Sequence, residues 1–161
     1  AAREPELVKE LVRRGHELGR HGYRHDHPKQ LDDASLRAHI SRSRDLLAEL
    51  TGVATRLYAP PYGEVDGRIA RIAAELGHWT IMWTLDTIDW QRPAPEVIVR
   101  RVVPRAQPGA IVLMHPTEPT VAALPTMLDA LADAGWRLVP VGDLLNRAVG
   151  EPASAAAPGM R

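Results

Sequence analysis

Residues 79–85 read Trp-Thr-Ile-Met-Trp-Thr-Leu, a short run of bulky apolar side chains that ends at Asp86. A short apolar run bounded by turn residues is typical of a strand buried in a sheet. A second such run, Ala110 to Met114, comes after a helical pattern over Pro95 to Arg105. Strand, helix and strand in this order favour parallel strands joined by helical crossovers, as an α/β barrel or an open sheet.

The rest of the chain continues this alternation. Apolar spacing, caps and turn residues predict four more helices, at residues 5–14, 32–51, 66–77 and 121–134, and a final one at 143–148. Strands are predicted at residues 16–19, 56–59 and 136–141. The composition from Gly150 onward is Ala, Pro, Gly and Ser, which predicts a disordered tail. We therefore predict one α/β domain over residues 1–149 and a tail over 150–161.

Composition excludes several classes of function. The 161 residues are 45% hydrophobic, enough for one compact domain with its own core. Twenty basic and twenty acidic residues cancel, so no overall charge favours nucleic acid or anionic membranes. No apolar run approaches the length of a membrane span. Cysteine is absent from the sequence, so only histidines and carboxylates remain as plausible metal ligands.

Two histidines four residues apart are candidate metal ligands. His21 and His25 lie in the segment His-Gly-Tyr-Arg-His, directly after the predicted strand at 16–19. Neutral imidazoles at this spacing can converge on one zinc-like ion and leave positions for a carboxylate and water. The alternative is a pair of surface or capped histidines. His27 is a nearby competitor that we expect to point elsewhere, because it lies two residues beyond His25.

Polar residues also end the two buried strands. Asp86, Asp89 and Trp90 follow the first, and carboxylates at the edge of a core are costly unless paired or used. The alternative is that Asp86 caps a turn and Trp90 packs. His115 follows the second strand, where a lone histidine is more often structural. Because the two strands are consecutive, we expect Asp89 and His115 to be neighbours. A carboxylate beside an imidazole favours its protonated form, which a general acid requires.

A proline-rich loop follows the strand at 56–59. It reads Pro60-Pro61-Tyr62-Gly63, and its first backbone donor is that of Tyr62, since proline has no N–H. A rigid loop that presents one N–H suits an oxyanion hole, and a plain structural turn explains it equally well.

Taken in order, four segments resemble the polysaccharide deacetylases of carbohydrate esterase family 4, the NodB-homology domain. They are residues 15–25, 59–63, 86–90 and 113–115, and the similarity spans about Glu6 to Leu145. The resemblance implies a distorted (β/α) barrel of the NodB type. Because the family's first motif would lie upstream of Ala1, we expect the barrel to lack its first strands.

The resemblance implies metal-dependent removal of acetyl groups from N- or O-acetylated sugars. It assigns His21 and His25 to the metal, which would be zinc, with cobalt or nickel as alternatives, and expects a third protein ligand upstream of Ala1. It makes His115 the general acid that protonates the departing amine, Asp89 its tuning carboxylate and Tyr62 the oxyanion donor. Trp90 and Leu113 would hold the acetyl methyl group, and Pro61 would also contact substrate.

Three departures from the family pattern bear on activity. The Asp pair that supplies the base and the third ligand is absent, Ala59 stands where an arginine is usual, and Gly22 stands where serine or threonine is usual. The segments Trp83 to Trp90 and Leu113 to Thr117 look most like a sporulation-associated subgroup with a partly eroded site.

Three hypotheses about function follow from these residues. The first is a deacetylase of an envelope polysaccharide such as peptidoglycan or a chitin-like chain, acting outside the cytoplasm as a monomer. The second is a non-catalytic glycan-binding or sporulation protein that keeps the fold. The third is a structural domain without metal. None of them involves nucleic acid or membrane contact by this segment.

Overall fold

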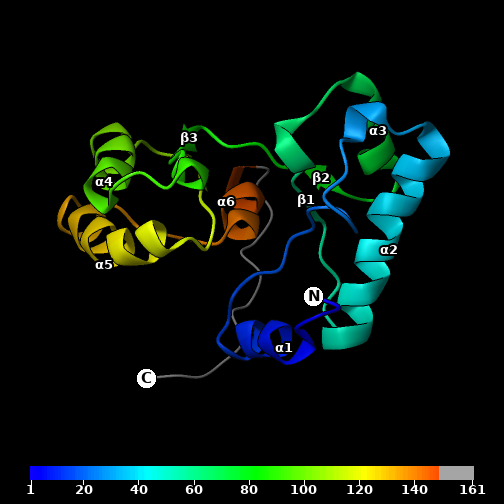
Figure 1. The fold of residues 1–161 in the computed structure, drawn as a ribbon, viewed down its shortest axis with the longest axis horizontal. Helices are drawn as coiled ribbons and strands as arrows, with labels where there is room; N and C mark the ends of the chain where they lie inside the picture. The colour runs from blue at the N-terminus through cyan, green and yellow to red at the C-terminus, as the bar shows by residue number, and fades with distance from the viewer. Residues whose placement is uncertain (149–161) are drawn as a thin grey trace. The chain divides into compact units, whose positions relative to one another are not determined.

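The computed structural model describes residues 1–148, which form two compact units. Unit 1 comprises Ala1–Met82 and unit 2 comprises Trp83–Ala148. Figure 1 shows the helices and strands of both units. The predicted single domain therefore stays a prediction, and the predicted tail lies outside the described residues.

Unit 1 contains three helices and a two-stranded parallel sheet. The helices are α1 (Pro5–Arg13), α2 (Asp33–Thr51) and α3 (Gly67–Glu75). Strand β1 (Leu57–Tyr58) pairs with β2 (Trp79–Thr80). The three helices confirm the sequence prediction. Helices α2 and α3 begin at local caps, since Asp32 accepts the Ser35 N–H at 2.7 Å and Asp66 accepts that of Ile69 at 2.8 Å, and α1 begins at Pro5. The core of the unit is made by Leu36, Ile40, Tyr58, Ile69, Ile72 and Ala73.

A buried cation lies beside strand β1 in unit 1, where Arg20 forms a backbone bridge with Tyr58. The Arg20 guanidinium is 3% exposed and donates hydrogen bonds to the His78 ring and to the Thr55 carbonyl. Burial, followed by the charge of Arg20, lowers the pKa of His78 to about 4. The imidazole is therefore neutral at neutral pH and serves as an acceptor for the guanidinium.

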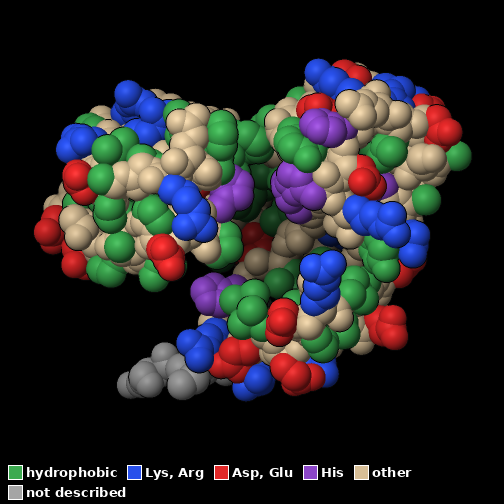
Figure 2. All heavy atoms as spheres, in the orientation of Figure 1, with side chains coloured by type: hydrophobic (Ala, Val, Ile, Leu, Met, Phe, Trp, Pro, Cys, Tyr) green, Lys and Arg blue, Asp and Glu red, His purple; other side chains and the backbone are tan. Residues whose placement is uncertain are grey.

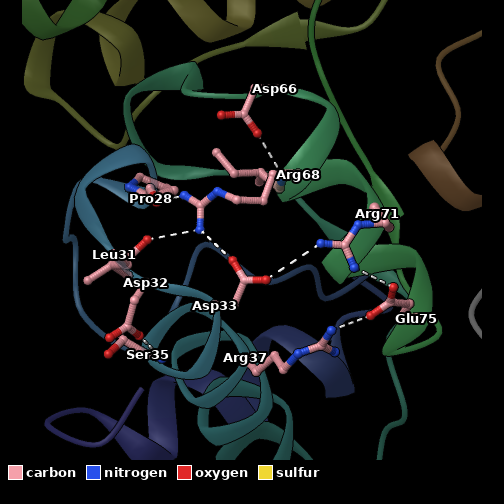
Figure 3. Close-up of polar contacts among 11 residues, drawn as sticks. Pro28, Leu31, Asp32, Asp33, Ser35, Arg37, Asp66, Arg68, Arg71 and Glu75 are labelled. Atoms are coloured by element: carbon pink, nitrogen blue, oxygen red, sulfur yellow. Dashed lines mark hydrogen bonds and ion pairs between the residues drawn. The ribbon is translucent and has the colours of Figure 1, made fainter.

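Charged side chains of both signs are interspersed over the face shown in Figure 2, as the zero net charge leads one to expect. In unit 1, charged side chains of α2 and α3 form a network (Figure 3). Asp33 accepts from Arg68 at 3.1 Å, Arg71 contacts both Asp33 and Glu75, and Arg37 also contacts Glu75. These side chains are largely exposed, so water screens the attraction between them.

Unit 2 is a second parallel strand pair with three helices. Strand β3 (Leu85–Asp86) pairs with β4 (Val112–Leu113). The helices are α4 (Pro95–Val102), α5 (Glu118–Asp133) and α6 (Val141–Ala148). A 3-10 turn at Val103–Arg105 continues α4. Helix α5 begins three residues earlier than the apolar pattern predicts, because Thr117 is its N-cap. Leu85, Val102, Met127 and Leu131 form the core.

Three strand predictions differ from the structure. The apolar run 79–85 forms two strands, β2 and β3, which belong to different sheets and flank the boundary between the units. Residues 136–140 are irregular, and residues 16–20 form one isolated bridge, between Arg20 and Tyr58. Apolar patterning indicates which residues are buried. It does not indicate which backbone groups form hydrogen bonds with a neighbouring strand, so it overestimates strand length. Within residues 1–148 the sheets are two strand pairs, and the predicted barrel is not seen there. None of the helices described is long and apolar enough to cross a membrane.

Candidate functional site

Asp89 and His115 form a hydrogen-bonded pair in unit 2, as the sequence predicts. Asp89 follows β3 in a 3-10 turn (Asp89–Gln91), and His115 follows β4. The pairing of β3 with β4 brings them together: His115 Nδ1 lies 2.7 Å from Asp89 Oδ1. Asp89 is fully buried, whereas the His115 side chain is 41% exposed. The carboxylate therefore holds one ring nitrogen, and Nε2 is the nitrogen available for proton transfer.

Two further donors hold the Asp89 carboxylate. Its Oδ2 accepts the backbone N–H of His115 at 2.5 Å and the hydroxyl of Thr120 at 2.6 Å. Thr120 lies in the first turn of α5 and is 4% exposed. Sequence reasoning missed Thr120, although its place three residues after the N-cap Thr117 was a signal. The segment after β4 and the first turn of α5 thus together fix one carboxylate.

Asp89 is ionised at neutral pH. Burial acts to raise its pKa, but the hydrogen bonds from the His115 backbone, from Thr120 and from the His115 ring, with the charge of that ring, hold the pKa below its ordinary value. A buried carboxylate that stays charged directs the His115 Nδ1–H toward itself. The arrangement fixes the ring and can stabilise it when Nε2 is also protonated.

The turn that carries Asp89 is strained. Ile88 has φ 54°, a left-handed conformation that is unusual for a β-branched residue. Its N–H donates to Asp86 Oδ1 at 2.8 Å, so Asp86 caps this turn. The alternative interpretation of Asp86, that it caps a turn, is therefore confirmed. The capped turn is the one that carries Asp89. Such strain persists only where surrounding contacts determine the conformation.

Two predicted apolar wall residues belong to the same unit. Trp90 directly follows Asp89 and is 60% exposed, which contradicts the alternative of a packed tryptophan. Leu113 is half-buried in β4, two residues before His115. An exposed indole beside the pair offers an apolar surface, and its part in binding an acetyl group stays a prediction.

His21 and His25 converge in unit 1. Their Nε2 atoms lie 3.1 Å apart, and the His21 Nδ1 makes a 2.8 Å hydrogen bond to the Ala59 carbonyl. Two nitrogens of a tetrahedral zinc site with Zn–N near 2.05 Å are about 3.3 Å apart. A hydrogen bond from the opposite ring nitrogen to a carbonyl is the usual way to orient a metal-binding histidine.

The proline loop packs around these histidines. Tyr62 is exposed with φ 59°; its ring contacts His25 edge-on at 4.4 Å between centroids and stacks on His27 at 3.8 Å. His27 is engaged elsewhere, as predicted, because its Nδ1 lies 2.8 Å from Glu64 Oε1. Pro61 is buried in this loop, and its predicted contact with substrate stays a prediction.

The imidazole pair fits two ligands of a metal site. The donor type, the separation of the Nε2 atoms and the Ala59 hydrogen bond all suit a divalent ion such as zinc. Among residues 1–148 no group of three or more histidines and carboxylates could hold a metal.

Solved structures define the class of this fold. A carbohydrate esterase family 4 pseudoenzyme from Bacillus anthracis superimposes with a TM-score of 0.87 at 37% identity, over 89% of this chain and 51% of that one. A mutant of a family 4 pseudoenzyme with restored enzymatic activity gives the same TM-score at 36% identity, over 89% of this chain and 53% of that one. The NodB-type fold of this esterase family is thereby confirmed.

The sequence profile named polysaccharide deacetylase matches residues 1–81. An uncharacterized protein of Bacillus subtilis, YlxY, is 36% identical over 88% of this chain and 44% of its own length. A peptidoglycan-N-acetylglucosamine deacetylase of Bacillus cereus is 34% identical over 89% of this chain and 70% of its own. The chain belongs to the polysaccharide deacetylase family. It spans about half the length of several relatives that it matches.

Proposed function

We propose that this chain is part of a metal-dependent hydrolase that removes acetyl groups from an acetylated polysaccharide of the cell envelope. The observation that carries the proposal is the Asp89–His115 pair at the ends of β3 and β4. A buried, ionised carboxylate that fixes a half-exposed imidazole is the arrangement of a general acid.

His115 would protonate the departing amine of an N-acetylated sugar. An amine cannot leave as an anion near neutral pH, so the proton must arrive as the C–N bond breaks. The proton would come from Nε2, while Nδ1 keeps its hydrogen bond to Asp89. Trp90 and Leu113 would contact the acetyl methyl group, and the backbone N–H of Tyr62 would donate to the carbonyl oxygen as negative charge develops there.

His21 and His25 would hold the divalent metal, zinc first and cobalt or nickel as alternatives. Bound there, the metal would polarise the acetyl carbonyl and activate the attacking water. The Ala59 carbonyl keeps the His21 ring oriented for this role. The expected third ligand and the base would be supplied from a segment upstream of Ala1.

Peptidoglycan is the proposed substrate, with chitin-like chains as the alternative. The support is the similarity to a Bacillus cereus protein named as a peptidoglycan-N-acetylglucosamine deacetylase. An extracytoplasmic site of action, a role in sporulation and a monomeric state are proposed with it.

Acetate release tests this function. The full-length protein that contains this chain is incubated with acetylated peptidoglycan or chitin oligomers, after treatment with a chelator and after addition of Zn²⁺ or Co²⁺. We expect acetate only with the metal. Acetate at the same rate in the chelator-treated sample would contradict metal dependence, and no acetate under either condition would reject the hydrolase.

A non-catalytic glycan-binding protein is the second candidate. It is favoured by Ala59, whose methyl group cannot replace the arginine usual in the family, and by the similarity to a pseudoenzyme. This candidate predicts that the full-length protein binds acetylated glycan and releases no acetate at any metal concentration.

A further inference from the structure

A third histidine lies against the loop that carries the imidazole pair. His39 is in the middle of α2 and is 6% exposed, on the same buried face as Leu36, Ile40 and Ser43. Its ring faces Gly22, the residue between the two candidate ligands that follows His21 directly. The mechanism proposed above does not use His39, so its burial there needs its own explanation.

The fit between His39 and Gly22 leaves no room for a side chain at position 22 unless the ring moves. A Cβ atom built on Gly22 would overlap His39 Nε2 and lie 2.6 Å from both neighbouring ring carbons. Gly22 also has φ 83°, a left-handed conformation that glycine adopts without strain. The imidazole therefore fills the volume that a side chain at position 22 would otherwise fill.

The two ring nitrogens of His39 make few polar contacts in the folded chain. Within residues 1–148, Nε2 is buried without a hydrogen-bond partner, and Nδ1 lies 3.6 Å from Asp26 Oδ2. Burial lowers the pKa of His39, with Asp26 opposing this shift, so the ring is neutral at neutral pH. An apolar side chain would fill the space in α2 without leaving a buried nitrogen unpaired.

We propose that His39 is a positioning residue for the imidazole pair: its ring packs into the notch left by Gly22 and holds residues 21–25 in the conformation that brings both Nε2 atoms together. The proposal rests on the metal role of His21 and His25. Other contacts to this loop come from the Ala59 carbonyl at His21, from the Tyr62 ring and hydroxyl at His25, and from the Arg42 guanidinium of α2, which lies 4.2 Å from the Tyr23 ring centroid. The three heavy atoms nearest a Cβ at Gly22 all belong to the His39 ring, so removal of the ring would open the space behind Gly22.

Metal binding measured without turnover tests the proposal. The full-length protein is titrated with Co²⁺ alone, and the visible absorption of bound Co²⁺ gives the affinity, while circular dichroism gives the melting temperature. We expect His39→Ala to weaken Co²⁺ binding by about tenfold or more, as loss of a supporting contact usually does. Ser43→Ala, a substitution on the same buried face of α2, is the matched control and should leave the affinity unchanged.

A compensating variant separates positioning from general damage. Gly22→Asn alone should also weaken binding, because asparagine tolerates the positive φ but its side chain overlaps the ring. Gly22→Asn combined with His39→Ala should bind Co²⁺ more tightly than either single variant, since the new side chain refills the same space. Recovery of affinity would support positioning by shape.

Three outcomes would overturn the proposal. His39→Ala with wild-type Co²⁺ affinity would show that the ring does not position the pair. A loss as complete as that of His21→Ala would make His39 a ligand instead. A double variant that binds Co²⁺ no more tightly than the better of the two single variants would show that the two sites do not share one volume. If His21→Ala also leaves Co²⁺ binding unchanged, the metal site of the proposed function is contradicted together with the role of His39. If His21→Ala abolishes Co²⁺ binding, the three outcomes above contradict only the role of His39.

Discussion

The two units hold their candidate catalytic groups in different ways. In unit 2, Asp89 accepts three hydrogen bonds from residues placed by β4 and by the first turn of α5, so regular structure determines its position. In unit 1, His21 and His25 lie on an irregular segment and depend on contacts with Ala59 and Tyr62. The acid–base pair is therefore held by the sheet and the helix that follows it, whereas the imidazole pair depends on loop packing.

Removing the ring of His115 is expected to have the largest effect. If the full-length protein is active, His115→Ala should lower turnover by about a hundredfold or more, as loss of a general acid does. Metal content, measured by atomic emission, should stay at the wild-type level, because His115 belongs to the acid–base pair and is not one of the candidate metal ligands. Equal losses of metal and turnover would show that His115 is a ligand and that the contrast between the units is false.

Acid should destabilise unit 1 before it affects Asp89. In the folded chain the pKa of His78 is lowered to about 4, whereas in the unfolded chain it is about 6.5. As the pH falls below 6.5, His78 is therefore protonated in the unfolded chain before it is protonated in the folded one. The stability that depends on neutral His78 is complete above pH 6.5 and is lost between there and about 4, on the order of 3 kcal/mol in all. His39, whose pKa is also lowered, acts in the same direction.

Urea unfolding between pH 7 and 4.5 measures this loss. His78→Gln should flatten the pH dependence, while His16→Gln, a substitution of an exposed histidine, should not. The pKa of Asp89 is lowered, so its contribution is present above its unfolded value near 3.9 and is lost only as pH falls further. An unchanged slope in His78→Gln would refute the role of the Arg20–His78 contact.

The network between α2 and α3 should matter least (Figure 3). Arg71 bridges Asp33 and Glu75, but its side chain is 52% exposed and its ion pairs compete with water. We expect Arg71→Ala to change the melting temperature only slightly and to leave Co²⁺ affinity unaltered. A large drop would mean that the packing of unit 1 relies on these pairs.

The sequence allowed prediction of elements whose determinants are local. Asp32 and Asp66 predict where α2 and α3 begin, because a cap bonds to a backbone group three residues away. The pairing of Asp89 with His115 was also predictable, since both follow consecutive apolar runs. The division of residues 79–85 into two strands was not, because the ladder partners lie far away in sequence, at Leu57 and Val112.

Features of the site that depend on tertiary contacts escaped prediction. Thr120 reaches Asp89 across 31 positions, and the packing of His39 against Gly22 joins a helix to a loop. A glycine in place of serine or threonine could be noted from the sequence only as a lost hydrogen bond. The structure shows that the vacant volume is occupied by a ring from another element.

The notch at Gly22 has a genetic consequence. In a library that varies one position at a time, position 22 should admit almost nothing but glycine, because every other residue meets the His39 ring. Once residue 39 is small, side chains that suit a left-handed backbone should become acceptable there. The effect of a substitution at position 22 would then depend on the residue at position 39. Scanning one site at a time would show an absolute requirement for glycine, although the requirement holds only while His39 is present.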